Sequence, residues 1–166
     1  EKKFPPSEYK MFVAVGYSKM RNRQQMFQKA KNKGYEFINY ISSQAQLAIG
    51  TVLGCNNVIL SNVVVEPNVC IQDNNIVWSN ATICHDVVIG NHNFFAAGVV
   101  IGGFTQVQNL CFVGFNSTVI QNLKILDESL IGAHSLQLRN TSQYSQWYGN
   151  PSNLIKYHME KGIEIK

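Results

Sequence analysis

The sequence lacks a membrane-length apolar run and a paired cysteine motif. No uninterrupted apolar stretch approaches the roughly 18 residues of a membrane-spanning helix, and residues 1–6 lead into no apolar signal-peptide core. The four cysteines include no C-x-x-C pair, so neither a zinc ribbon nor a dithiol redox motif is indicated. We expect them to be small packing residues of a protein in a reducing cytoplasm: Cys55, Cys70, Cys84 and Cys111.

Charge is scarce over most of the chain and concentrated at its start. Of the 14 Lys and Arg residues, nine fall within the first 33 positions, whereas residues 47–136 hold Lys124 as their one cation against five carboxylates. A basic segment of this kind can face nucleic acid or a nucleotide-linked small molecule. No nucleic-acid-binding motif accompanies it to favour the first option, and we expect no nucleic-acid partner.

What the sequence does contain is a six-residue repeat. Fifteen consecutive hexapeptides between Leu47 and Leu136 each begin with an apolar residue, without an insertion. With 45% apolar residues in the chain, such a run would arise by chance about once in 10⁵ sequences. A period of six matches neither an α-helix nor a plain strand, and it is typical of a parallel β-helix. The starting residues are Leu47, Leu53, Ile59, Val65, Ile71, Val77, Ile83, Ile89, Phe95, Ile101, Val107, Val113, Val119, Ile125 and Ile131.

The repeat predicts a mainly β fold, a parallel β-helix of about five triangular coils. Three hexads make one coil, so residues eighteen apart stack about 4.8 Å from each other. The fourth position of the hexads is rich in Asn and Gly, which tolerate left-handed backbone and build turns, so this position marks the corners. His92 and His134 occupy it, and we therefore expect them to be corner residues.

The residues before the repeat predict part of a small α/β domain. A buried strand is expected at residues 11–16, and a second strand at residues 35–41. Between them we expect a helix over residues 18–33, with Ser18 as its N-cap and Gly34 as its stop. This β-α-β unit is too small to be a complete domain; a first half of that domain has either been lost or lies outside this sequence, and the sequence leaves both open.

The hexads stop after Leu136. Residues 137–146 are expected to form a polar loop, residues 147–151 a last partial turn, and residues 152–160 a short terminal helix. The predicted units are a partial α/β domain at 1–44, a parallel β-helix at 45–136, and a closing loop with a short C-terminal helix at 137–166.

His85 departs from the corner pattern. It occupies the third position of its hexad, and the eighteen-residue register places Gly103 beside it. A glycine there would leave an open backbone N–H next to an acid–base group, which is what acyl transfer requires. A surface histidine beside a corner is the alternative that the spacing leaves open. Cys84 adjoins His85 but points away if the strand alternation holds, so it is not expected to be a nucleophile.

Residues 77–103 resemble the central motif of left-handed β-helix sugar acyltransferases. The relevant group comprises sialic acid O-acetyltransferase-like and nucleotide-aminosugar N-acetyltransferases. The resemblance extends to that group's nucleotide-sugar domain, last coil and closing segment, at residues 12–19, 35–42, 131–135 and 149–151.

The resemblance implies a left-handed β-helix enzyme that uses acetyl-coenzyme A, holds no metal, and forms a homotrimer with active sites between subunits. It implies that His85 is the general base and that Asp86 orients it, with direct attack of the acceptor on the thioester and the Gly103 N–H at the thioester carbonyl. It places coenzyme A at Gly103, Gly114, Ala133, Gly149 and Pro151. It places the nucleotide sugar at Gly16, Tyr17, Ser18 and Lys19.

The chain departs from the group's pattern in three places. Phe94 stands where many members have a second histidine near the coenzyme. Asn153 replaces a lysine that commonly follows the closing proline, so a phosphate contact there is in doubt. The glycine-rich first loop of the nucleotide-sugar domain has no counterpart in the sequence, which would weaken substrate affinity.

Two other classes share such a repeat. A γ-class carbonic anhydrase holds zinc with three histidines, but here the histidines occupy different hexad positions and lack the i, i+5 spacing that resemblance to that class would require. An ice-binding solenoid needs regular threonine ladders, and threonine is sparse here. A relative that binds without catalysing remains open.

Among acyltransferases, the front segment most resembles the enzymes that acetylate amines. The sequence therefore favours N-acetylation of a nucleotide-linked 4-amino-4,6-dideoxyhexose, such as viosamine or a bacillosamine precursor, in glycan biosynthesis. O-acetylation of a sugar or of sialic acid is the alternative.

Overall fold

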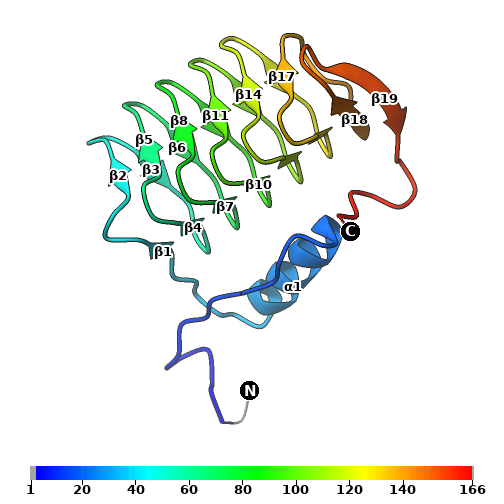
Figure 1. The fold of residues 1–166 in the computed structure, drawn as a ribbon. Coiled ribbons are helices and arrows are strands. Elements are labelled where there is room, and N and C mark those ends of the chain that lie inside the picture. Colours follow the sequence, from blue (N-terminus) through cyan, green and yellow to red (C-terminus); the bar gives the residue numbers. More distant parts are fainter. Residues whose placement is uncertain (1–2, 166) are drawn as a thin grey trace.

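The computed structural model describes residues 3–165, so Glu1, Lys2 and Lys166 lie outside the described residues. The chain forms a triangular solenoid with helix α1 (Met20–Asn32) along one side and a hairpin at its C-terminal end (Figure 1). Within this part of the chain, no helix is long and apolar enough to cross a membrane.

The strands form three sheets, one on each face of the triangle, and their pairs are parallel except for β18 with β19. The eight-stranded sheet has the order β1-β4-β7-β10-β13-β16-β18-β19, the six-stranded sheet β17-β14-β11-β8-β5-β2, and the five-stranded sheet β15-β12-β9-β6-β3. The strands are β1 Tyr40–Ile41, β2 Gln46–Leu47, β3 Val52–Leu53, β4 Val58–Ile59, β5 Val64–Val65, β6 Cys70–Ile71, β7 Ile76–Val77, β8 Thr82–Ile83, β9 Val88–Ile89, β10 Phe94–Phe95, β11 Val100–Ile101, β12 Gln106–Val107, β13 Phe112–Val113, β14 Thr118–Val119, β15 Lys124–Ile125, β16 Leu130–Ile131, β17 Leu136–Gln137, β18 Ser145–Tyr148 and β19 Asn153–Tyr157.

The eighteen-residue register is confirmed. Ile83, for example, pairs with Val65 on one side and with Ile101 on the other. Of the fifteen hexad-starting residues, thirteen are at most 3% exposed, so the three apolar columns fill the prism. Leu47 and Leu53 are only half-buried, because few residues of an earlier coil cover them.

The left-handed β-helix is confirmed as the fold type, but the count of about five coils was too low. The solenoid makes about six turns. β1 precedes the first predicted hexad and pairs with β4, while β18 follows the last hexad and pairs with β16. The Trp147 segment therefore closes a further partial turn, as predicted.

The corners lie where the hexads place them. The fourth hexad position has a left-handed backbone throughout, with φ between 51° and 65° at its non-glycine residues. These are Asn56, Asn62, Asn68, Asn74, Asn80, Asp86, His92, Phe104, Leu110, Asn116, Asn122, Glu128 and His134. His92 and His134 are thus corner residues, as expected from their position.

Buried side-chain amides connect successive coils at the corner that α1 covers. Asn57 Oδ1 accepts a hydrogen bond from the Asn75 backbone N–H at 2.8 Å, Asn75 Oδ1 from Asn93 at 2.9 Å, and Asn93 Oδ1 from Cys111 at 2.7 Å. Each amide replaces a backbone partner that the turn removes, so few buried donors are left unpaired.

The predicted helix is present, and Gly34 ends it with a left-handed φ of +84°. The prediction of Ser18 as N-cap was wrong, because Lys19 holds that position and no side chain caps it. Arg23 fastens α1 to the solenoid. It is 1% exposed and donates to the backbone oxygens of His92, Asn93 and Asn74.

The two strands predicted beside this helix are largely absent. Residues 11–16 contribute only an isolated bridge between Met11 and Phe37. The segment instead binds a corner side chain, since the Val13 N–H donates to Asn56 Oδ1 at 2.7 Å. Of residues 35–41, only β1 is a strand, and it joins the solenoid. A two-stranded pair alone is marginal, whereas the solenoid offers backbone partners.

The predicted C-terminal helix at residues 152–160 was wrong. Residues Asn153–Tyr157 form β19, which pairs antiparallel with β18. β18 would otherwise leave the edge of the eight-stranded sheet without partners, and a hairpin satisfies those backbone groups. Residues 137–146 likewise contain strand residues at both ends rather than loop throughout.

His92 makes the stability of this fold depend on pH. Burial, with a smaller effect from the charge of Arg23, lowers the pKa of His92 from 6.5 to about 4. The unfolded chain therefore binds a proton that the folded chain excludes, so this contribution to stability is present above about pH 6.5 and is lost as the pH falls towards 4. We expect the melting temperature to fall across that window.

The substitution His92→Asn should flatten part of that slope, because asparagine suits the left-handed corner and does not titrate. Thermal melts between pH 7.5 and 4.5 measure this. His134→Asn is the matched control at an exposed corner of similar φ and should leave the slope unchanged. An identical slope in the His92 variant would contradict the prediction.

Candidate active site

His85 and Asp86 form a hydrogen-bonded pair on an exposed corner. The corner lies between β8 and β9, where the six-stranded sheet meets the five-stranded sheet. His85 Nδ1 and Asp86 Oδ2 are 2.9 Å apart, and the side chains are 49% and 35% exposed. A carboxylate accepting from Nδ1–H fixes the tautomer that leaves Nε2 with a free lone pair. The second nitrogen can then accept a proton.

Two side chains of the preceding coil support this pair, and the sequence reasoning missed both. Asn68 Nδ2 donates to Asp86 Oδ1 at 3.2 Å, and Glu66 Oε2 accepts from the His85 backbone N–H at 2.8 Å. Asn68 lies eighteen residues before Asp86, so the register already contained the signal for this contact.

Gly103 lies directly against the His85 imidazole. A Cβ atom at Gly103 would be 2.8 Å from His85 Cε1 and 2.9 Å from Nε2. Within residues 3–165, the Gly103 N–H makes no hydrogen bond, although its carbonyl accepts from Asn122. The glycine thus provides room for the ring, and its N–H has no partner among the described residues. The prediction that Gly103 lies beside His85 is confirmed.

Phe104 is a third feature that the sequence reasoning missed. Its ring packs edge-on against His85 with the centroids 5.1 Å apart and an interplanar angle of 84°. Its backbone N–H donates to the His85 carbonyl at 3.1 Å. The sequence did contain a signal for this role, because Phe104 is a bulky residue at the fourth hexad position, which otherwise favours Asn and Gly.

Cys84 is a poor nucleophile in this setting. Burial, and to a smaller extent the charge of Glu66, raises the pKa of the Cys84 thiol. The thiolate is the reactive form, so the environment disfavours it, in agreement with the sequence interpretation.

The residues predicted to contact coenzyme A lie mostly on another corner. Gly114 packs against Ala133, because a Cβ at Gly114 would be 2.5 Å from the Ala133 nitrogen. This corner joins the eight-stranded sheet to the six-stranded sheet. The Gly149 N–H donates to Ser135 Oγ at 3.2 Å, and Gly149 is adjacent to the Pro151 carbonyl. Only Gly103 of the predicted set lies beside His85.

The segment predicted to bind the nucleotide sugar lies over the eight-stranded sheet. Tyr17 packs on Phe94, with ring centroids 4.4 Å apart, so Phe94 has a packing role at the position of the missing second histidine. The Ser18 carbonyl accepts from Ile165 at 3.0 Å, and Lys19 Nζ is 3.6 Å from Glu164 Oε1. Gly16 is exposed, with open space where its side chain would be. One chain therefore does not bring these residues to His85.

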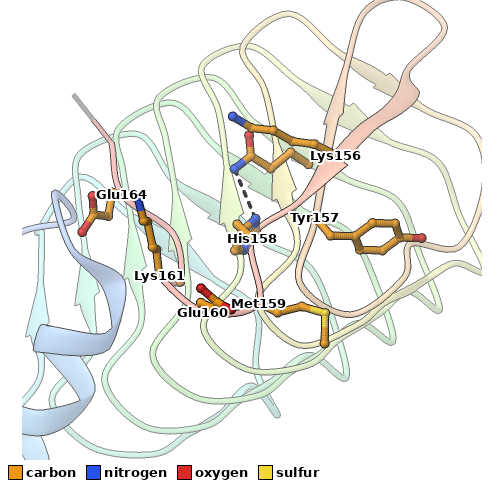
Figure 2. A pocket seen from close by; sticks show the side chains of 9 residues that line it. Lys156, Tyr157, His158, Met159, Glu160, Lys161 and Glu164 are labelled. Atoms are coloured by element: carbon orange, nitrogen blue, oxygen red, sulfur yellow. Dashed lines mark hydrogen bonds between the residues drawn. The ribbon is translucent and has the colours of Figure 1, made fainter.

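A surface pocket of about 470 Å³ is lined by the end of β19, the segment that follows it and Gln146, away from the His85 corner (Figure 2). Gln146 Nε2 and His158 Nδ1 are 3.2 Å apart there, and burial lowers the pKa of His158. Lysines and glutamates both line it, including Lys161 and Glu164, so the pocket selects no charge. It contains none of the residues predicted for the active site.

His92 serves the fold rather than chemistry. Asn74 Nδ2 lies 2.9 Å from its Nδ1, and Phe27 packs against its ring. Among residues 3–165, no three His, Cys, Asp or Glu side chains are grouped to hold a metal ion.

Comparison with known proteins supports the resemblance to hexapeptide-repeat acyltransferases. The bacterial transferase hexapeptide family (six repeats) matches residues 50–85 and 71–103. An acyl-(acyl-carrier-protein)–UDP-N-acetylglucosamine O-acyltransferase of Helicobacter pylori is 24% identical over 125 residues, covering 69% of this chain and 46% of its own. The chain thus spans less than half the length of this curated relative.

Solved structures share the fold. PerB from Caulobacter crescentus, in complex with CoA and GDP-perosamine, has a TM-score of 0.86 at 23% identity, over 90% of this chain and 71% of its own. The acetyltransferase domain of PglB from Neisseria gonorrhoeae, in complex with acetyl coenzyme A, has a TM-score of 0.86 at 21% identity, over 93% and 74%. At these identities the likeness establishes the left-handed β-helix fold.

The contact between Gly103 and His85 yields a test of the site. In Gly103→Ala the new methyl group would displace the exposed imidazole, which we expect to appear as a changed NMR shift of the His85 ring. We expect His85-dependent turnover to fall about 10²-fold, with the melting temperature nearly unchanged.

Gly102→Ala is the control for a merely steric effect on the fold. A Cβ at Gly102 would meet the backbone nitrogen of Gln121 at 2.5 Å, which cannot swing aside, so this variant should lose thermal stability. A Gly103→Ala protein with an unmoved His85 signal and full turnover would refute the arrangement.

Proposed function

We propose that the protein transfers an acetyl group from acetyl-coenzyme A to the amino group of a nucleotide-linked 4-amino-4,6-dideoxyhexose of the viosamine type. The observation that carries this proposal is the His85–Asp86 pair with Gly103 packed against the imidazole, the Gly103 N–H having no partner within residues 3–165. The acceptor class is supported by the fold neighbours, of which PerB is in complex with CoA and GDP-perosamine and the PglB domain with acetyl coenzyme A.

The reaction is direct transfer without a covalent enzyme intermediate. The neutral amine of the sugar attacks the thioester carbonyl carbon, and His85 Nε2 takes the proton that the nitrogen loses. Asp86 holds the imidazole in the required tautomer and stabilises its protonated form. The C–S bond then breaks, and coenzyme A leaves as the thiol after it receives a proton from His85.

Stabilisation of the oxyanion falls to the backbone. As the thioester carbonyl becomes tetrahedral, its oxygen gains negative charge, and the Gly103 N–H is the donor available beside His85. A fixed backbone donor needs no reorganisation during the reaction, which is why such groups contribute strongly to catalysis.

We propose that the working enzyme is a homotrimer. The coenzyme residues Gly114, Ala133, Gly149 and Pro151 and the base His85 lie on different corners of one prism, so a single chain cannot bring them together. Packing prisms side by side about a threefold axis would join one subunit's coenzyme corner to its neighbour's His85. Residues 16–19 would bind the nucleotide part of the acceptor. The reaction would belong to cytoplasmic glycan biosynthesis.

O-acetylation of a sugar is the second candidate. It is supported by the curated relatives, which are named as O-acyltransferases. The same base would remove a proton from a hydroxyl group instead of an amine. Incubation with acetyl-coenzyme A and paired nucleotide aminosugars and hydroxy sugars, with release of free thiol as the signal, distinguishes the two.

Replacing the base tests the mechanism. His85→Ala should lower kcat by about 10²–10⁴-fold, while the melting temperature stays close to that of the unmodified protein, because the side chain is half exposed. Unchanged thiol release would exclude His85 as the base.

Asp86→Asn separates orientation from folding. Asparagine suits the left-handed corner and can still bond Asn68, so the fold should persist. Loss of the carboxylate should lower kcat by at least about tenfold through the imidazole tautomer. Full activity in this variant would remove Asp86 from the mechanism.

A further inference from the structure

Phe104 is a bulky residue in a backbone conformation that normally selects Asn or Gly. Its φ is +59°, and its side chain is 54% exposed. A large side chain in the left-handed region is an outlier that costs free energy. Leu110 shares this backbone, but it is only 6% exposed, so burial accounts for it. Burial of Phe104 is too small to offset the free-energy cost of its backbone conformation, which indicates another role of its ring.

The ring of Phe104 forms an apolar wall beside the candidate base. It packs edge-on against His85, and the hydrogen bond from its N–H to the His85 carbonyl ties the two residues together. Of the neighbouring polar side chains, Asp86 contacts the imidazole itself, Asn68 contacts Asp86, and Glu66 accepts from the His85 backbone N–H. A molecule that approaches His85 from the side of Phe104 therefore meets an exposed aromatic surface next to the imidazole.

We propose that Phe104 is a specificity-determining residue that selects a deoxygenated, methyl-bearing sugar as the acceptor. This proposal rests on the proposed N-acetylation at His85. In a 4-amino-4,6-dideoxyhexose the methyl group is attached to the ring carbon next to the one that bears the amine. An amine within reach of His85 therefore brings that methyl group close to the neighbouring aromatic ring.

The same wall disfavours an acceptor with a hydroxyl group at that position. A hydroxyl against the Phe104 ring loses hydrogen bonds to water and gains none from the ring. A methyl group instead removes apolar surface from water. The expected discrimination is the modest one that an apolar contact gives, about 10–100-fold in kcat/KM.

The test compares a nucleotide-linked 4-amino-4,6-dideoxyhexose with its 6-hydroxy counterpart. The unmodified protein should prefer the deoxy sugar by about 10–100-fold in kcat/KM. Phe104→Asn should reduce that preference to within about threefold, mainly through KM for the deoxy sugar. Its melting temperature should be unchanged or higher by about 2–4 °C, because asparagine suits the left-handed backbone. Phe104→Leu should retain part of the preference.

Ile49→Asn is the matched control. Ile49 is an apolar residue on the same corner, two coils before His85, and its side chain is fully exposed. Its replacement should leave both the preference and KM unchanged. An unaltered preference in Phe104→Asn would overturn the proposal. Equal loss with both sugars together with a changed oligomeric state, measured by light scattering, would make Phe104 an interface residue and would also overturn it.

Calorimetric binding of both sugars in the absence of coenzyme separates this proposal from the function on which it rests. Binding that prefers the deoxy sugar and depends on Phe104, without any acetyl transfer, would support the selectivity and refute the proposed function. Acetyl transfer with a preference for the deoxy sugar that replacement of Phe104 does not change would support the proposed function and refute the proposed role of Phe104. Binding of neither sugar would overturn both.

Discussion

The left-handed corner is the constraint on which the rest of the structure depends. Every coil turns three times on a residue with positive φ, a conformation that costs about 1–2 kcal/mol for an ordinary side chain. Asparagine lowers this cost because its short amide bonds locally, and at the corner under α1 the amides also join coil to coil. Since every corner turns alike, strands eighteen residues apart stay in register along the whole solenoid.

The sequence predicted those parts of the protein in which one rule repeats. The apolar columns, the corner role of His92 and the position of Gly103 beside His85 all follow from counting in eighteens. The short terminal segments escaped prediction because their structure is decided by the partners that the solenoid offers. Asn153–Tyr157 becomes a strand because an unpaired sheet edge lies next to it, and the helix prediction there considered only local spacing. The contact of Asn68 with Asp86 was within reach of the register, whereas the edge-on packing of Phe104 required the structure.

The three faces divide the proposed site into separate parts. The basic front segment covers the eight-stranded sheet, His85 stands on the corner opposite that sheet, and Gly114 with Ala133 occupies a third position. A rigid prism cannot fold these parts towards one another. In the proposed trimer the association of subunits therefore takes the place that domain closure has in a hinged enzyme, and the geometry of catalysis is set by assembly.

The stacking of Gly103 on His85 has a consequence for how such a protein can change over evolution. The coils that carry His85 and Gly103 are separated by one rung, about 4.8 Å, and no loop intervenes to adjust that spacing. Insertion of a single residue would move every later side chain to a different face, whereas insertion of a full turn would preserve all faces and only lengthen the column. A functional group on this scaffold can therefore change its position only by whole rungs, or be replaced at the same position. Phe104 shows that the left-handed corner also accepts an aromatic side chain.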